Sequence, residues 1–160
     1  MSISPATSPR ALRSNRRLPK NVRQAHGELS VSTRGKGLYD ISREVRQWVA
    51  KQGIACGLLT VFLQHTSASL TIQENADPDV RRDMLEFYER LVPENTPWFR
   101  HTLEGPDDMP SHIRASLTSA SLTIPVRGGA PALGTWQGIY VFEHRAGPER
   151  RNLLLHLLGE

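Results

Sequence analysis

The chain has 160 residues, of which 38% are hydrophobic and 22% are charged, the composition of an ordinary globular domain. No stretch approaches the roughly 18 consecutive apolar residues of a membrane-spanning helix, and no early apolar segment resembles a secretion signal. The single cysteine, Cys56, excludes an internal disulfide, and we expect it to be a small buried side chain. We therefore expect one cytoplasmic domain with no membrane partner.

The net charge of +4 arises at the amino-terminal end. Residues 1–25 contain six basic residues and no acidic one, which leaves 14 basic and 16 acidic residues in 26–160. We expect residues 1–24 to form a flexible basic tail and residues 25–160 to form the domain. Such a tail can also bind nucleic acid through counterion release, and its Ser and Arg content is shared by organelle transit peptides. We rank nucleic acid as an unlikely partner.

The first half of the chain is predicted to alternate strands with one helix. Residues 27–33 alternate in hydropathy and predict a strand. A helix is expected from Asp40 to about residue 52, with Asp40 as its cap. Residues 57–63 are apolar on both faces of an extended strand, so we expect a central strand covered on both faces. Residues 68–73 predict a further strand.

The second half contains a long loop between two helices. Asp77 followed by Pro78 is a strong helix start, and apolar residues at helical spacing continue to a stop before Pro93. Residues 93–109 are rich in Pro, Gly, Asp, Glu and His, and loops of this length are usually functional or disordered. The remaining expected elements are a helix at 110–119 and strands at 121–126, 134–143 and 152–158. The strand 121–126 is expected at an edge of the sheet because it contains a proline.

The order of these elements predicts the fold class. Helices and strands mix without a regular β–α–β alternation, and the late strands are joined by short turns. This pattern favours a single α+β domain with a largely antiparallel sheet or sandwich and helices packed on one side. We expect Trp136 to lie in its core.

Three of the six histidines lie among hydroxyls, carboxylates and turn residues. His65 follows the predicted buried strand, and His101 and His112 are separated by a loop that contains Asp107 and Asp108. Imidazole is the commonest metal ligand in proteins and the usual proton shuttle near neutral pH. Taken alone, His65 is equally well explained as a satisfied strand-end residue. The two aspartates fit a third metal ligand, an acceptor for an imidazole N–H, or a helix cap.

Further polar residues lie at the ends of predicted strands, where rigid scaffolds present chemistry. An arginine near a cavity binds phosphate or carboxylate in a forked geometry. The acidic segment around Asn75 could hold Mg²⁺ through oxygen ligands, although Asp77 within it is better explained as a helix cap. The residues that we expect to contact a substrate are Thr66, Ser67, Asn75, Glu143 and Arg145.

Four segments together resemble one family. Residues 63–69, 74–80, 101–112 and 133–140 look like the motifs of the YjbQ-like family, whose members are often labelled secondary thiamine-phosphate synthases. The resemblance runs in order from about residue 25 to 160 and leaves the tail outside. It implies a compact α+β domain, commonly a homotrimer with sites near subunit boundaries.

The resemblance also implies that His65, His101 and His112 are shared site residues that bind a divalent metal. It implies a secondary activity that joins a pyrimidine pyrophosphate to a thiazole phosphate. We therefore expect an enzyme that acts on a small phosphorylated metabolite, with catalytic residues His65, His101, His112 and Asp107. The expected metal is Zn²⁺ or another first-row ion, with Mg²⁺ as an option for a pyrophosphate substrate. The alternative is a non-catalytic module that binds the metal or the metabolite.

Overall fold

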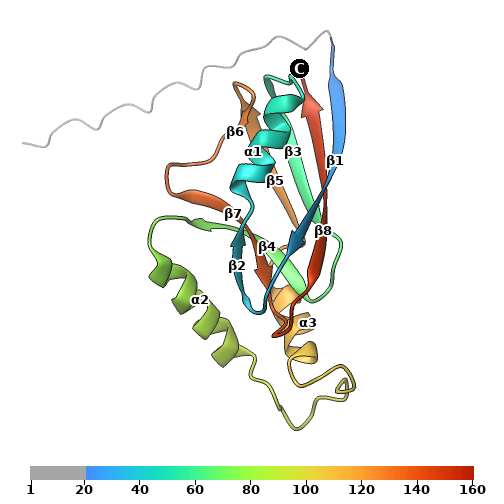
Figure 1. Cartoon of the computed structure of the whole chain (residues 1–160), viewed down its shortest axis with the longest axis vertical. Helices are drawn as coiled ribbons and strands as arrows, with labels where there is room; N and C mark the ends of the chain where they lie inside the picture. Colours follow the sequence, from blue (N-terminus) through green and yellow to red (C-terminus); the bar gives the residue numbers. More distant parts are fainter. Residues whose placement is uncertain (1–20) are drawn as a thin grey trace, which may run out of the picture.

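The computed structural model describes residues 21–160 (Figure 1). Most of the predicted tail therefore lies outside the described residues, and the first strand begins at Arg23, just before the expected domain boundary. Across the described part of the chain, no helix combines the length and apolar character needed to cross a membrane. The elements are β1 (Arg23–Ser32), β2 (Gly37–Asp40), α1 (Ser42–Lys51), β3 (Cys56–Leu63), β4 (Ala68–Glu74), α2 (Pro78–Leu91), α3 (Asp108–Leu117), β5 (Ser121–Arg127), β6 (Ala130–Pro131), β7 (Gln137–Glu143) and β8 (Arg150–Gly159).

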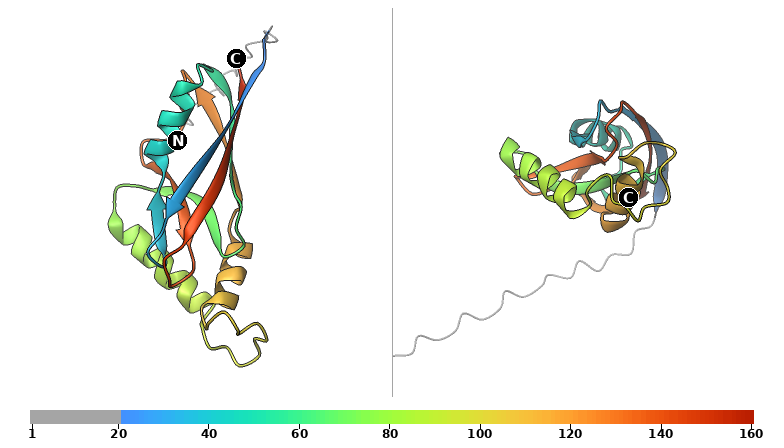
Figure 2. Two further views of the ribbon diagram at one scale, coloured as in Figure 1. Left: turned by 45° about the vertical axis from the view of Figure 1, so that its right-hand side comes forward. Right: turned by 90° about the horizontal axis from the view of Figure 1, so that it is seen from below.

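The strands form two sheets that enclose the core (Figures 1 and 2). One sheet has five strands in the order β1-β8-β3-β5-β6, and the other has three in the order β2-β7-β4. Every strand pair in both sheets is antiparallel. The predicted α+β class with antiparallel sheets is therefore confirmed.

The helices occupy different parts of this scaffold. Helix α1 contributes the fully buried Val45 and Val49 to the core, as its predicted apolar stripe requires. Helix α2 has no buried residue and leans on the body through Tyr88, whose ring meets Phe142 edge-on at 5.2 Å between centroids. Helix α3 lies at the lower end of the molecule, where the long loop returns to the sheets (Figure 2). That end carries the residues described below.

The predicted helix starts are formed by the expected side chains. The Asp77 carboxylate accepts a hydrogen bond from the Asp79 amide at 2.8 Å and caps α2. The Asp40 carboxylate accepts from the Ser42 amide at 2.8 Å, one residue before the formal cap of α1. Short polar side chains satisfy amides that have no partner inside the helix.

The prediction that β3 is covered on both faces is wrong. Its inward residues are buried, but Leu58 and Phe62 on the other face are 46% and 43% exposed. Among the described residues nothing packs over this outer face, which also leaves Cys56 exposed rather than buried. Trp136 is likewise 64% exposed, because it lies in the turn before β7 instead of the core. The short strands β2 and β6 were not predicted.

Candidate functional site

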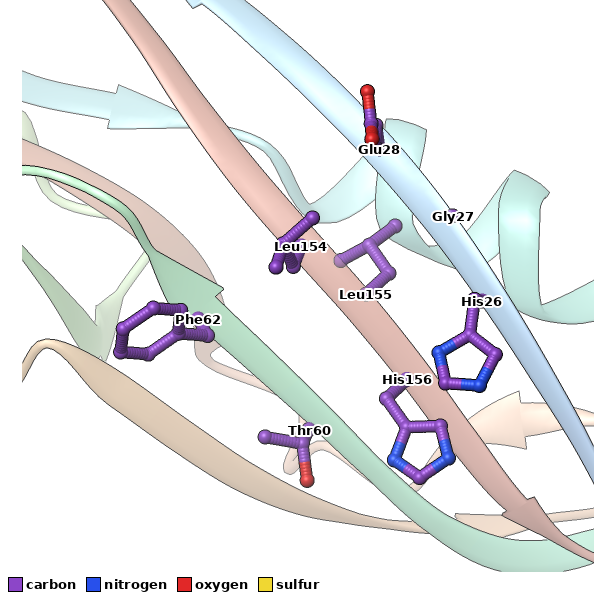
Figure 3. Close-up of a pocket in the computed structure, with 8 residues that line it drawn as sticks. All are labelled: His26, Gly27, Glu28, Thr60, Phe62, Leu154, Leu155 and His156. Carbon is purple, nitrogen blue, oxygen red and sulfur yellow. The ribbon is translucent and has the colours of Figure 1, made fainter.

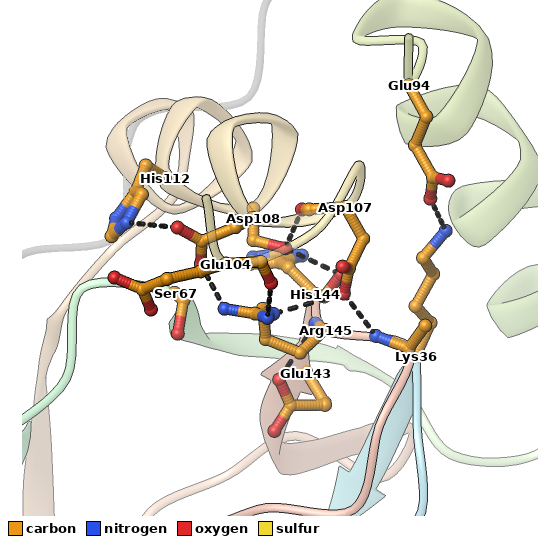
Figure 4. A network of polar contacts seen from close by, with 12 residues as sticks. Lys36, Ser67, Glu94, Glu104, Asp107, Asp108, His112, Glu143, His144 and Arg145 are labelled. Carbon is orange, nitrogen blue, oxygen red and sulfur yellow. Dashed lines mark hydrogen bonds and ion pairs between the residues drawn. The ribbon is translucent and has the colours of Figure 1, made fainter. Parts of the chain in front are cut away.

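Two histidines and one aspartate meet where the long loop enters α3. Figure 4 labels two of the three, Asp108 and His112. His101 comes from the loop, and Asp108 and His112 lie four residues apart on α3, so they share one helix face. The Nε2 atoms of His101 and His112 lie 2.7 and 3.4 Å from Oδ2 of Asp108. One possible ligand atom from each residue lies within 4.8 Å of the others. The three side chains therefore converge at the spacing of a single metal ion.

The cluster is open to solvent on the imidazole side. The side chains of His101 and His112 are 45% and 33% exposed, whereas Asp108 is only 2% exposed. A buried carboxylate beneath two accessible imidazoles leaves room for an incoming ligand above them. Three protein ligands with an open position are typical of catalytic metal sites, in contrast to closed structural ones.

A backbone carbonyl fixes the orientation of His112. Its Nδ1 atom lies 3.0 Å from the carbonyl oxygen of Thr66. Because a carbonyl oxygen only accepts hydrogen bonds, Nδ1 must donate, and the proton of neutral His112 therefore lies on Nδ1. The Nε2 lone pair then faces the Asp108 carboxylate, which is unfavourable unless a cation or a second proton lies between them. The predicted site residue Thr66 thus acts through its backbone.

Arg145 holds the carboxylates of Asp108 and Asp107 in place (Figure 4). Its guanidinium donates to Oδ2 of Asp107 at 3.0 Å, to Oδ1 of Asp108, and to the carbonyl of Glu104 at 2.9 Å. Oδ1 of Asp108 is therefore engaged, and Oδ2 is left for the two imidazoles. All three sides of the Arg145 fork have protein partners, so its position is that of a clamp rather than of a free substrate contact.

Asp107 orients this clamp. Its Oδ2 atom also accepts the Ala146 amide at 2.8 Å. Burial alone raises the pKa of Asp107, but the hydrogen bond from Ala146 and the charge of Arg145 outweigh it and lower the pKa. The carboxylate therefore stays ionised, and the structure places it behind the cluster instead of within it. Asp107 gives no side-chain cap to α3.

The structure does not bring His65 into the cluster. Its Nε2 atom accepts the Asn152 amide at 2.8 Å, and its Nδ1 atom faces a guanidinium nitrogen of Arg151 at 3.5 Å. Burial and the charge of Arg151 lower the pKa of His65, so its neutral form is favoured. Within this chain, the third member beside His101 and His112 is Asp108, and His65 supports the adjoining strand end.

The other predicted substrate contacts lie in different surroundings. Ser67 is half-buried in the loop after β3 and is drawn with the polar network in Figure 4. Asn75 is exposed and lines a separate cavity of about 390 Å³ with Asp40 and Ser42. Glu143 is completely buried and paired with Arg151. The backbone carbonyl of Ser67 accepts a hydrogen bond from Arg151 at 3.5 Å.

A buried histidine supports the floor of the site. His144 is 1% exposed, and its Nε2 atom shares a hydrogen bond with the Ser69 hydroxyl at 2.9 Å. Burial, together with the charges of Arg114 and Arg151, lowers the pKa of His144 to about 3. The Ser111 hydroxyl donates to the backbone carbonyl of His144 at 2.8 Å and so ties α3 to the end of β7. Neutral His144 is thus part of the packing and does not reach solvent.

The sequence interpretation named Asp107 and Asp108 together as candidates for a third metal ligand and did not distinguish Asp108 from Asp107. A helix expected from residue 110 left Asp108 in the loop, where it was one of two equivalent aspartates. The structural helix starts at Asp108, which puts it one turn from His112. The spacing of Asp108 and His112 was the signal that could have identified the pair.

The fold and the cluster together define a two-sheet α+β protein with a solvent-facing His/Asp/His site. Residues 27–160 match the family model described as UPF0047 protein YjbQ-like. A UPF0047 protein of Synechocystis is 48% identical over 86% of this chain and 94% of its own length. YjbQ of Escherichia coli O157:H7 is 44% identical over 82% of this chain and 96% of its own.

Solved structures agree with this assignment. A YjbQ/UPF0047 family protein of Clostridium acetobutylicum superposes with a TM-score of 0.73 at 39% identity, covering 80% of this chain and 96% of that chain. A protein of Sulfolobus solfataricus P2, titled YbjQ-like, reaches a TM-score of 0.80 at 28% identity, covering 88% and 100%. The chain belongs to the YjbQ-like UPF0047 family, as the sequence motifs predicted.

Proposed function

We propose that this chain is a metal-dependent enzyme whose ion is held by His101, Asp108 and His112. The observation that carries the proposal is the hydrogen bond from His112 Nδ1 to the Thr66 carbonyl, which aims the Nε2 lone pair at Asp108. Metal-binding imidazoles are commonly oriented by a backbone carbonyl in this way. The nitrogen and oxygen donors suit Zn²⁺ or another first-row divalent ion better than Mg²⁺.

The residues of the site support chemistry on an anionic substrate. A divalent ion held there supplies a Lewis acid that stabilises negative charge developing on a phosphate oxygen. Asp108 and Asp107 carry two negative charges against one positive charge on Arg145, so the protein groups alone repel a phosphate. The exposed imidazole side of the cluster faces the incoming ligand, while Arg145 keeps Asp108 in position.

The substrate that we propose is a small phosphorylated metabolite. The family resemblance supports the joining of a pyrimidine pyrophosphate to a thiazole phosphate as a secondary activity. The departing pyrophosphate needs charge neutralisation, which an ion held by His101, Asp108 and His112 would supply, because Arg145 is already engaged. The second candidate function is a non-catalytic module, favoured by the same convergent ligands, which binds the metal or the metabolite without turnover.

Metal analysis of variants tests the ligand set. The wild-type protein, loaded with Zn²⁺ and dialysed, is expected to retain about one equivalent, as one His/Asp/His cluster would hold. His101→Ala and His112→Ala should each weaken Zn²⁺ binding by at least about 100-fold. Removing a direct ligand costs more affinity than removing a residue that only hydrogen-bonds to a ligand. His65→Ala should retain the ion and is the matched control. The readout is Zn²⁺ affinity by competition with a chelator.

Two outcomes discriminate between the readings. Stoichiometric Zn²⁺ in a His101→Ala/His112→Ala double variant would contradict the proposed centre. Turnover of pyrimidine pyrophosphate and thiazole phosphate by the loaded protein, lost in both single variants, supports the enzyme. Ligand-induced thermal stabilisation with no product supports the binding module.

We also propose that the chain forms the homotrimer that the resemblance implies, and that the outer face of the five-stranded sheet is the contact between copies. This face exposes Leu154 and Leu158 of β8 by 37% and 44% next to the exposed β3 residues. It includes a cavity of about 400 Å³ where His26 and His156 stack at 4.5 Å (Figure 3). The buried Nε2 of His156 has no hydrogen-bond partner among the described residues. An apolar face of this extent is typical of protein–protein contacts.

A charge on this face should dissociate the assembly. Phe62→Lys places an ammonium among leucines and is expected to convert the mass measured by light scattering from three chains to one. Trp136→Lys changes a more exposed aromatic residue, 64% against 43% for Phe62, in the turn before β7; it is the control and should keep the wild-type mass. A wild-type monomer, or a trimer that tolerates Phe62→Lys, would contradict the assignment of this face.

A further inference from the structure

A cavity adjoins the His101 side of the cluster. It measures about 310 Å³ and lies between the long loop and the first turn of α3. The loop closes around it because Asn95 adopts a left-handed backbone with φ of 56° and the Phe99 amide bonds to the Thr96 carbonyl at 3.1 Å. At its start the loop is anchored by Arg114, which donates to the Val92 carbonyl at 2.7 Å. The cavity wall is thus a fixed part of the domain.

The cavity differs in chemistry from the cluster beside it. Phe99, Pro106 and Met109 form an apolar wall, and Thr96 and Thr102 add hydroxyls. Among the described residues, no Asp, Glu, Lys or Arg side chain belongs to its lining. The polar groups of the lining are the Asn95 amide, two hydroxyls and the His101 ring, so the cavity favours an uncharged occupant over an ionic one.

The lining also indicates the shape of the occupant. Phe99 presents an aromatic ring and Met109 a polarisable thioether, and both bind best to the faces and edges of flat rings. The Thr102 hydroxyl can donate to or accept from heteroatoms at a ring edge, whereas the Thr96 hydroxyl donates to the Pro93 carbonyl at 2.9 Å and can only accept. A volume of about 310 Å³ is at the small end of ligand pockets, which suits one substituted ring.

We infer that this cavity binds the uncharged, flat ring of a ligand whose anionic group reaches the His101–Asp108–His112 cluster. His101 lines the cavity and belongs to the cluster, so a ligand can occupy both at once. The inference rests on the proposed function for the anionic end of the ligand only. The ring end depends on the cavity alone and is testable without the metal.

Methionine methyl groups give a direct readout of occupancy. The chain has three methionines, and of the two in residues 21–160, Met84 and Met109, only Met109 lines the cavity. In the full chain labelled with ¹³C at methionine methyls, benzyl diphosphate with Zn²⁺ should shift the Met109 signal through the ring current of its aromatic group. Met84 on α2 serves as the internal reference and should not move. Inorganic diphosphate should leave Met109 without a ring-current shift.

A variant of the wall separates the two ends of the ligand. Phe99→Ala should weaken benzyl diphosphate about tenfold, the equivalent of one aromatic contact, and leave the affinity for inorganic diphosphate unchanged. The matched control is Phe87→Ala, an exposed phenylalanine on α2 that should change neither affinity. Equal affinities of wild type for the two diphosphates, or an unmoved Met109 signal at saturation, would overturn the inference.

Failure of the proposed function gives a different result. If inorganic diphosphate does not bind with Zn²⁺, but benzyl alcohol still shifts Met109 and loses affinity in Phe99→Ala, the ring subsite stands and the metal–phosphate proposal fails. If benzyl alcohol and benzyl diphosphate both leave Met109 unmoved while inorganic diphosphate binds, the metal proposal stands and the ring subsite is rejected.

Discussion

Asp108→Asn is expected to weaken binding of Zn²⁺ by at least about 100-fold and to reduce any metal-dependent turnover to background. Within residues 21–160, Asp108 contributes the only carboxylate oxygen between the two imidazoles, and its side chain is 2% exposed. The amide keeps the shape of the carboxylate but removes the charge that the ion requires. Arg145 retains Asp107 as its partner, so the variant should fold. Chelator competition measures the affinity, and circular dichroism checks the fold.

Asp107→Asn is the matched control, because it makes the same chemical change one residue earlier. Asp107 contacts Arg145 and the Ala146 amide but neither imidazole. Loss of the Asp107 charge should loosen the Arg145 clamp. The affinity for Zn²⁺ should then fall by only about tenfold, as is usual when a residue that orients a metal ligand is changed. If Asp107→Asn proves more damaging than Asp108→Asn, the assignment of Asp108 as the ligand is wrong.

The location of the site could be predicted from residues 101–112, but its ligand set could not. A loop rich in His and Asp that leads into a helix is a local feature, and local features are readable from sequence. The identity of the third member depends on where α3 begins, and helix boundaries are set by local capping that shifts by one or two residues. That shift decides whether Asp108 shares a helix face with His112.

The role of His65 depends on the pairing register of strands that lie far apart in the chain. This register cannot be predicted from a single sequence. Leu63 of β3 pairs with Leu153 of β8, and this register delivers the Asn152 amide to the His65 ring. A shift by one residue would turn the ring to the other side of the sheet. The position of His65 at a strand end therefore predicted that its side chain would be held in place. It did not predict which residue would hold it.

The coverage of β3 was mispredicted for a related reason. An apolar outer face at Leu58 and Phe62 reads the same whether a helix of its own chain or another copy covers it. The antiparallel fold was predictable because turn residues and the alternation of hydropathy are local features. The covering of a sheet face is not a local feature, so it could not be predicted in the same way.

Glu143→Gln is expected to lower the free energy of unfolding by about 3 kcal/mol, the cost of breaking a buried ion pair from one side. Arg151 donates to the two Glu143 oxygens at 2.7 and 2.6 Å, and their side chains are 4% and 0% exposed. Glu143 also accepts from the Arg145 amide at 2.9 Å and the Thr33 hydroxyl at 2.8 Å. Burial alone raises the pKa of Glu143, but these hydrogen bonds outweigh it and lower the pKa, so the group is charged at neutral pH. Urea denaturation at pH 7 measures the change.

Two further variants show whether charge or shape causes the loss. Thr33→Val removes one hydrogen bond from a hydroxyl to the Glu143 carboxylate and should cost only about 1.5 kcal/mol. Glu143→Leu combined with Arg151→Met replaces both charges by apolar groups and should recover most of the stability lost in Glu143→Gln, because no buried charge is left without a partner. A Glu143→Gln protein within about 0.5 kcal/mol of wild type, the scatter of surface substitutions, would show that the pair is solvated in solution. The Arg145 amide also donates to Glu143. Loss of the Glu143–Arg151 pair should therefore weaken Zn²⁺ binding as well, because it loosens Arg145, which holds Asp108. The interior of the sheet is linked to the cluster in this way.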